Sequence, residues 1–218
     1  MKRIGLMLLT LLLLFAVSCQ QAGQAVSEEE TPYKESSFLS FLVSYEDGVF
    51  SFSKAPWGAS KAEWLKAMGL SEEDLTLGAG SDEEFETYIV KKLIYFEDIS
   101  CPGVLMAEFY NDQLRLVTVN ISGDSSVWNE NSYLEISDQE KYPDVDMLQV
   151  LSKVADQIEA SSMPDSEIDG GIEKGLRVDR VADAAAQWWD SEGNIVFAIH
   201  PMSGTDIISF TVRNDLGL

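Results

Sequence analysis

Two cysteines, Cys19 and Cys101, and one histidine, His200, are the residues of this chain that could act as a nucleophile and its base. A cysteine nucleophile needs a general base within hydrogen-bond reach. Cys101 stands before Pro102 and Gly103, a turn signal, and His200 is the one histidine that could serve it. We expect a buried or half-buried thiol without chemistry at Cys101, and a structural or surface histidine at His200.

The segment 165–173 has the acid spacing of a calcium-binding loop. Its positions one, three and five are acidic and Gly170 stands at position six. Position twelve should supply a bidentate carboxylate but is Leu176, and Pro164 interrupts the helix that should lead into the loop. We therefore predict a solvated glycine-rich turn without a metal ligand, and calcium binding is the alternative.

Other catalytic motifs are lacking or incomplete. A single histidine excludes His-rich metal sites, and the chain has neither a Gly-x-x-x-x-Gly-Lys phosphate loop nor a Gly-x-Ser-x-Gly elbow. Ser51 and Lys54 match Ser-x-x-Lys, but the serine falls in a predicted strand and the companion motifs are missing. We predict no catalytic residue, no cofactor-binding residue and no cofactor.

Cys19 is placed for a different chemistry, because it follows an export signal. Lys2 and Arg3 precede an apolar run over 4–17, and the small residue Ser18 stands directly before the cysteine. The run is shorter than the roughly 20 residues needed to cross a bilayer. The arrangement resembles the signal of bacterial lipoproteins, which implies cleavage before Cys19 and acylation of its thiol. An ordinary signal peptide, with the cysteine there by chance, is the alternative.

Lipidation of Cys19 predicts a mature chain attached by lipid to a membrane of the cell envelope. This would be the outer membrane where two membranes are present, and otherwise the outer face of the plasma membrane. Removal of residues 1–18 would leave 13 basic and 37 acidic residues, a net charge of −24. Nucleic acid repels such a chain, so we expect no nucleic-acid partner. The acidity serves solubility, or else attracts a basic partner or divalent cations.

Composition divides the chain into a signal peptide over 1–18, a flexible tether over 19–37 and a globular domain over 38–218, with possible halves at 38–123 and 143–218. Eighteen coil residues would reach roughly 24 Å. Hydrophobic residues make up 45 % of the chain, which is enough for a core. With its partner thiol lipidated, Cys101 could form no intrachain disulfide, so the core must hold the fold.

Capping and turn signals predict where the helices begin and end. A hairpin over 38–52 turns at Asp47-Gly48, and a helix begins with a capping box of Ser60 and Glu63 and ends at Gly69. The remaining start and stop signals are two capped turns, Ser71 with Asp74 and Ser81 with Glu84, and a second helix capped by Asp144 that ends before Pro164.

Alternating apolar residues predict strands over 88–96, 104–110, 113–121, 184–189, 195–200 and 207–213. A turn at 111–112 joins the second and third of these, and residues 107–112 resemble residues 186–191. The predicted fold is therefore α+β, with two pseudo-repeats of one helix plus three antiparallel strands, and with the helices packed on one face of the sheet.

The segment 52–63, with Pro56-Trp57-Gly58 followed by Ser60 and Glu63, resembles a helix start found in small exported bacterial lipoproteins. It is similar to outer-membrane assembly lipoproteins and to proteins that inhibit β-lactamases. The resemblance covers about a dozen residues. It implies a helix-plus-antiparallel-sheet fold and a protein that binds other proteins by its surface, without catalysis.

Trp188 and Trp189 are neighbours in a predicted strand, so one ring should enter the core while the other points outward. We expect a non-enzymatic, lipid-anchored envelope protein that binds another macromolecule, an unknown protein, through a sheet face or a groove between the repeats. A solute- or glycan-binding lipoprotein with a cleft lined by Trp189 or Trp128 is the alternative. A hydrolase that uses paired carboxylates is the third.

Overall fold

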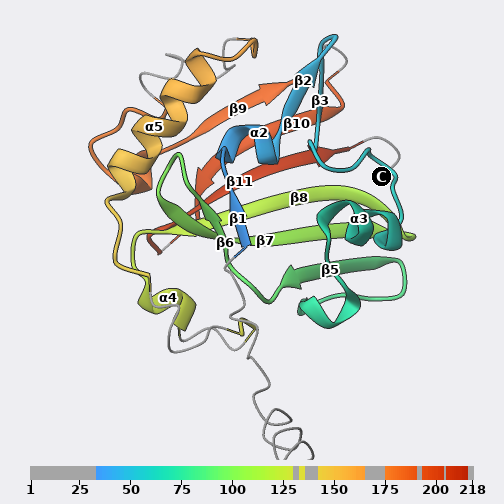
Figure 1. The fold of residues 1–218 in the computed structure, drawn as a ribbon. Helices are drawn as coiled ribbons and strands as arrows, with labels where there is room; N and C mark the ends of the chain where they lie inside the picture. Colours follow the sequence, from blue (N-terminus) through green and yellow to red (C-terminus); the bar gives the residue numbers. More distant parts are fainter. Residues whose placement is uncertain are drawn as a thin grey trace, which may run out of the picture. The chain divides into compact units, whose positions relative to one another are not determined.

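The computed structural model describes residues 33–129, 133–135, 142–164, 175–190, 193–203 and 205–215 (Figure 1). Cys19 and the segment 165–173 lie outside these residues, as does most of the predicted tether. Among the described residues, no helix is long and apolar enough to span a membrane. The helices are α2 (Phe38–Leu42), α3 (Lys61–Met68), α4 (Ser126–Asn129) and α5 (Met147–Glu159), with short 3-10 turns at η1 (Glu72–Asp74) and η2 (Val181–Asp183).

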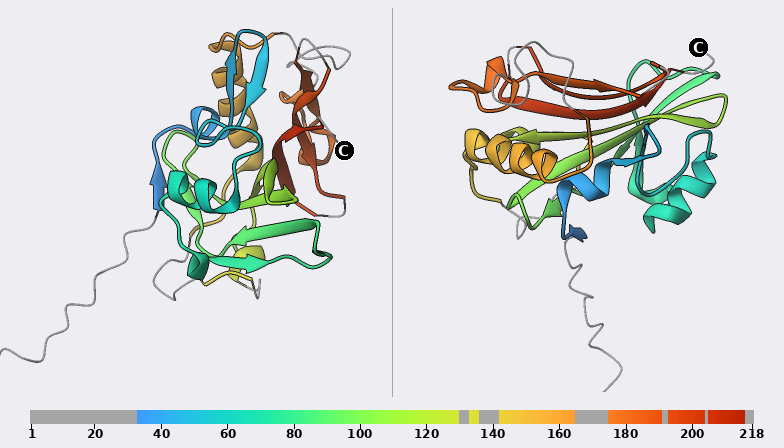
Figure 2. Two further views of the ribbon diagram at one scale, coloured as in Figure 1. Left: turned by 90° about the vertical axis from the view of Figure 1, so that its right-hand side faces the viewer. Right: turned by 90° about the horizontal axis from the view of Figure 1, so that it is seen from above.

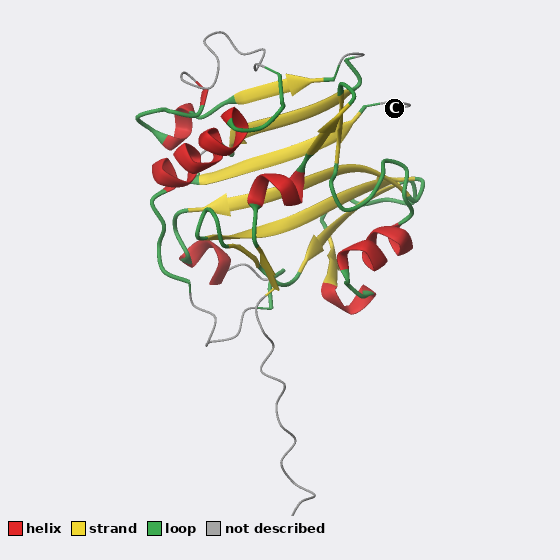
Figure 3. Cartoon of the chain, turned by 45° about the horizontal axis from the view of Figure 1, so that its top comes forward, coloured by secondary structure: helices red, strands yellow, loops and turns green. Residues whose placement is uncertain are grey.

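One nine-stranded sheet forms the centre of the fold (Figure 3). Its main path is β1-β6-β7-β8-β11-β10-β9, and β5 pairs with both β7 and β4. The pairs are antiparallel except β1 with β6. The strands of this sheet are β1 (Tyr33–Glu35), β4 (Leu75–Leu77), β5 (Phe85–Val90), β6 (Ile94–Phe96), β7 (Cys101–Tyr110), β8 (Gln113–Ser122), β9 (Ala186–Trp189), β10 (Ile195–Pro201) and β11 (Ile207–Asn214).

The prediction of two pseudo-repeats is wrong, because strands of both halves form this single sheet. β8 from the first half pairs with β11 from the second over residues 116–122 and 207–213. The predicted strand over 88–96 is also two strands, β5 and β6, which pair with different parts of β7. Between them the Lys91 N–H donates to the Asp74 carbonyl, next to the pair of Leu75 and Val90 that ends the contact of β4 with β5. The result is more β-rich than one helix and three strands repeated twice.

The capping box at α3 is confirmed. The Ser60 hydroxyl accepts a hydrogen bond from the Glu63 N–H, and a Glu63 carboxylate oxygen accepts from the Ser60 N–H at 2.9 Å. Gly69 ends the helix with φ of 67°, a left-handed conformation that costs glycine little. The predicted turn at Ser71 and Asp74 is η1. The predicted capped turn at Ser81 and Glu84 is wrong, because the Ser81 hydroxyl donates to the Gly78 carbonyl and accepts the Thr87 N–H instead.

Helix α5 begins two residues later than predicted. Asp146, not Asp144, caps it by accepting the N–H groups of Leu148 and Gln149. Asp144 instead accepts the N–H and hydroxyl of Ser125. Leu148, in the first turn, lies outside the buried face of α5, and its exposed fraction is 37 %.

The predicted hairpin over 38–52 is shorter than expected, because its first residues form α2. Four of the five α2 residues are buried, at a helical rather than an alternating spacing. The Asp98 carboxylate accepts the Phe38 N–H at 3.0 Å and fixes the start of this helix. The remaining hairpin, β2 (Ser44–Glu46) with β3 (Val49–Ser51), turns at Asp47 and Gly48 with positive φ, as predicted.

The main core lies between the sheet and the elements α2, α3, α5 and β2–β3, which share one side of it (Figure 2). Phe38 of α2 packs edge-on against Phe96 of β6 and Phe210 of β11, with ring centroids 4.9 and 4.8 Å apart. Trp188 of β9 stacks on Phe197 of β10 at 5.0 Å. These rings connect both ends of the chain within one core.

Cys101 begins β7 rather than a turn, and it is fully buried, as expected. Burial raises the pKa of its thiol to about 12, against a smaller opposing effect of Lys153. A thiol with such a pKa supplies almost no thiolate at neutral pH.

Candidate binding surface

The opposite side of the sheet is largely uncovered by the described residues. Because side chains alternate along a strand, the positions between the core residues of β7 to β11 point to this side. In the left view of Figure 2 the helices α2, α3 and α5 lie on one side of the strands. We call this surface the open face; it consists of Met106, Glu108, Tyr110, Leu116, Thr118, Asn120, Gln187, Trp189, Val196, Ala198, His200, Ile207, Ser209, Thr211 and Arg213.

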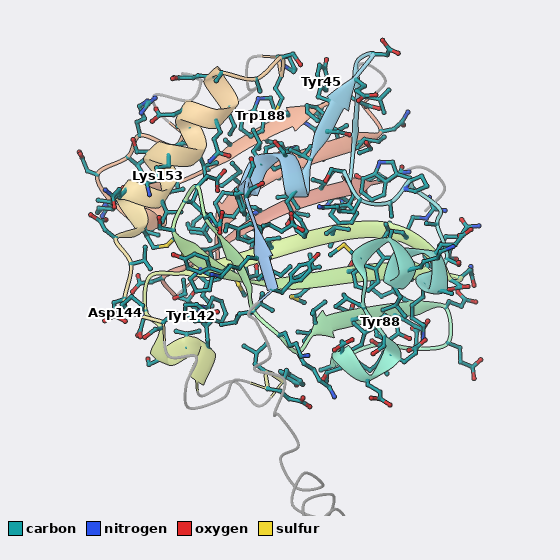
Figure 4. The ribbon with its side chains drawn as sticks, viewed as in Figure 1. Tyr45, Tyr88, Tyr142, Asp144, Lys153 and Trp188 are labelled. Carbon is teal, nitrogen blue, oxygen red and sulfur yellow. The ribbon has the colours of Figure 1, made fainter. Side chains whose placement is uncertain are left out.

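The side chains of the two adjacent tryptophans point to opposite sides of the sheet, as predicted. Trp188 is fully buried in the core, and Trp189 is partly exposed on the open face. In the view of Figure 4, Trp188 lies between α5 and the hairpin of β2 and β3. His200 is exposed on the open face, as a surface histidine should be. Trp128, the other proposed cleft residue, is only 4 % exposed, so it could not line an open cleft.

One continuous row of side chains crosses the open face and extends onto β5. The registers place one residue from each of six neighbouring strands side by side: Thr87, Glu108, Leu116, Arg213, Val196 and Trp189. Glu108 and Arg213 therefore flank β8 symmetrically, two strand spacings or about 10 Å apart.

Burial raises the pKa of the Glu108 carboxyl, and the positive charge of Arg213 partly opposes that rise. The Glu108 carboxylate is thus partly desolvated. No carboxylate faces it directly, because its register partners are Thr87 and Leu116. The arrangement does not resemble the paired carboxylates of a hydrolase.

Small polar side chains occupy the centre of the open face and bond to each other across strands. The hydroxyls of Thr118 and Thr211 lie 2.9 Å apart. The Ser209 hydroxyl donates to the Asn120 side-chain oxygen at 2.6 Å. These bonds keep the centre flat and leave its hydroxyls only partly exposed or buried.

Helix α4 bounds the open face at one end. Trp128 packs with Leu93 and Val104 in a second, small hydrophobic cluster that Met106 also joins. Tyr142 stacks on Tyr95 beside this cluster, with ring centroids 5.7 Å apart.

A shallow acidic depression of about 540 Å³ lies at the start of α5, near Asp144 in Figure 4. Three of its aspartates have partners in the chain. The Ser126 hydroxyl and N–H bond to Asp124 and lower the pKa of its carboxyl, Asp144 accepts from Ser125, and Asp146 caps α5. Within the described part of the chain, no three acidic, histidine or cysteine residues converge to hold a metal ion.

Comparison of the chain with protein-family models, with curated proteins and with solved structures finds no match.

The sequence predicts binding through a sheet face or a groove between the repeats, but it named no residues for either. Glu108 and Arg213 stand on strands far apart in the chain, and only the pairing of β8 with both β7 and β11 brings them into one row. The available signal was the alternation within 104–110 and 207–213, whose polar positions mark the outward side.

Proposed function

We propose that this protein is a non-enzymatic envelope protein, anchored by lipid at Cys19, that binds another macromolecule through the open face. The observation that carries the proposal is the charge of this surface. Glu108 and Arg213 are its two charged residues at neutral pH and have opposite signs, and Arg213 also pairs with Asp215 at the end of β11, on a chain whose net charge is −22. A solvated face of such a chain should carry many acids. Depletion of charge is typical of the centre of a protein interface.

The composition of the open face also fits a broad contact rather than a small-molecule cleft. Trp189, Tyr110 and Leu116 are partly exposed there, and aromatic residues are enriched at interfaces. Small-molecule sites are usually concave and bury most of their ligand. The open face is flat and carries hydroxyl groups and a few aromatic rings, so it suits a broad macromolecular contact better than a small ligand.

A glycan is the second candidate ligand, favoured by Trp189 beside Gln187 on edge strand β9. A sugar could stack on the exposed ring and bond to the nearby polar groups. The contact would be confined to the edge of the open face, whereas the charge depletion extends across β7, β8, β10 and β11. We therefore favour a macromolecule that covers the whole face.

Photo-crosslinking in living cells tests this proposal. A photoreactive amino acid replaces Thr211 at the centre of the open face or, as a control, Lys66 on the exposed side of α3. We expect covalent adducts of higher mass from position 211 and none from position 66. Absence of adducts from 211, or equal adducts from both positions, would refute a binding role for the open face.

A further inference from the structure

We propose that the occupant of the open face is a second copy of this chain, packed sheet against sheet. This inference rests on the proposed function and names its partner. The row that contains Glu108, Leu116 and Arg213 carries the argument, because it is complementary to itself.

The symmetry follows from the order of the strands. A two-fold axis that runs along β8, between two facing sheets, places β7 of one copy opposite β11 of the other. Position along the strand is unchanged by this rotation. Each Glu108 then faces Arg213 of the second copy, and each Arg213 faces Glu108, so the dimer contains the same charge pair twice.

Side-chain size is complementary under the same operation. Met106 and Thr118 lie in one row with Thr211, and Ile89 and Ala198 extend that row on either side. Met106 and Ile89 are partly buried, because they also pack against the Trp128 cluster. The rotation places large Met106 opposite small Thr211, and large Ile89 opposite small Ala198. Facing sheets pack about 10 Å apart when large and small residues alternate across the contact.

Electrostatics favours this partner over an unrelated basic protein. A basic partner would be drawn to the acidic surfaces, whereas the open face has almost no net charge to attract it. A second copy contributes an equally neutral face. Within its own copy Arg213 binds Asp215 through Nε and Nη2, and with its remaining N–H groups it would also stabilise the partly desolvated Glu108 carboxylate across the contact.

The contact area sets the expected strength. The five neighbouring strands β5, β7, β8, β11 and β10 span about 24 Å across the sheet. Along the strands, about six residues lie between α4 and the β7–β8 turn, a length of about 20 Å. This is about 500 Å² per copy and about 1,000 Å² in total, the lower limit for a specific interface. We expect weak association in solution, strengthened when lipid confines both copies to one membrane and raises their effective concentration.

Charge reversal with two tags tests the dimer. The full chain with its lipid is prepared with either of two C-terminal affinity tags and reconstituted into phosphatidylcholine vesicles. After brief crosslinking and solubilisation, capture of one tag should retain the other. Glu108→Arg alone or Arg213→Glu alone should reduce retention at least about tenfold, since like charges would then face each other. The double variant should restore it.

A mixture of the two single variants separates lost binding from lost folding. Glu108→Arg presents two positive groups and Arg213→Glu two negative groups, so the mixture should associate although neither variant does so alone. Lys66→Glu and Glu73→Arg, exposed charge reversals around α3, should leave retention unchanged.

Lack of retention between wild-type copies, or single reversals without effect, would overturn the dimer. The photo-crosslinking experiment keeps the two proposals apart. Adducts from position 211 at twice the mass of the chain support both proposals. Adducts with a protein of another mass support the binding role of the open face and overturn the second copy.

Discussion

Replacement of Phe38 by alanine should destabilise the whole protein, because this ring joins both halves of the chain in one core. Phe38 is fully buried and contacts Phe96 and Phe210 edge-on, with ring centroids 4.9 and 4.8 Å apart. A buried Phe→Ala change costs about 3–5 kcal/mol, and part of this loss comes from edge-to-face pairs of about 0.5–1.5 kcal/mol each. We therefore expect a loss of about 4 kcal/mol in the free energy of unfolding.

Urea unfolding followed by tryptophan fluorescence and by far-ultraviolet circular dichroism measures this loss. The two probes should give one coincident transition, as expected of a single cooperative core. Phe85→Ala, a partly exposed phenylalanine on β5, is the matched control and should cost about 1 kcal/mol. If Phe38→Ala does not fold, Phe38→Leu should still lower the stability by about 1–2 kcal/mol.

A loss below about 1.5 kcal/mol for Phe38→Ala would contradict the proposed packing of α2. Two separate transitions, with only one of them shifted by the substitution, would contradict a core shared by β6 and β11. The second result would return the fold to two independent halves.

Four further changes test other parts of the chain. Cys19→Ser should abolish incorporation of an alkyne-labelled fatty acid, and persistent labelling would refute the lipid site. Ser60→Ala removes the side-chain cap of α3 and should cost about 1 kcal/mol in urea unfolding, while Ser40→Ala, an exposed serine in α2, should cost less. Cys101 should resist a thiol reagent at pH 8 until urea is added, because its thiol is buried and its pKa is about 12; rapid labelling of the folded protein would contradict this. Burial raises the pKa of Glu108 in the folded state, so its contribution to stability is largest at low pH and is lost as the pH rises through the folded value. Glu108→Gln should therefore gain stability relative to wild type from pH 4 to pH 7, and a constant difference would refute the shift.

Local features of the fold were accessible from the sequence because a few adjacent residues decide them. The capping box of Ser60 and Glu63 and the positive-φ turns at Asp47-Gly48 and Asn111-Asp112 depend on short-range bonds and backbone preference. The strands over 195–200 and 207–213 were also predicted closely, since their alternation is clear.

Contacts between distant segments produced the errors. Residues 38–42 have apolar side chains that suit a strand or a helix, and the bond from Phe38 to Asp98 selects the helix. Asp144 and Asp146 are both suitable N-cap residues for α5. Asp144 accepts a hydrogen bond from Ser125 instead, and Asp146 caps the helix. In each case a partner far away in the chain decides between two local options of similar free energy.

The sequence by itself determined the acidity of the chain, the capped helix α3, the tight turns and the alternation of the later strands, and it predicts an export signal with lipidation of Cys19. Each of these depends on composition or on residues within one or two turns of chain. Only the tertiary structure decided that both halves share one sheet, and that Glu108 and Arg213 lie in one row of its open face. Strand order and register are set by packing across the whole core, and an alternating pattern alone does not specify which strands pair.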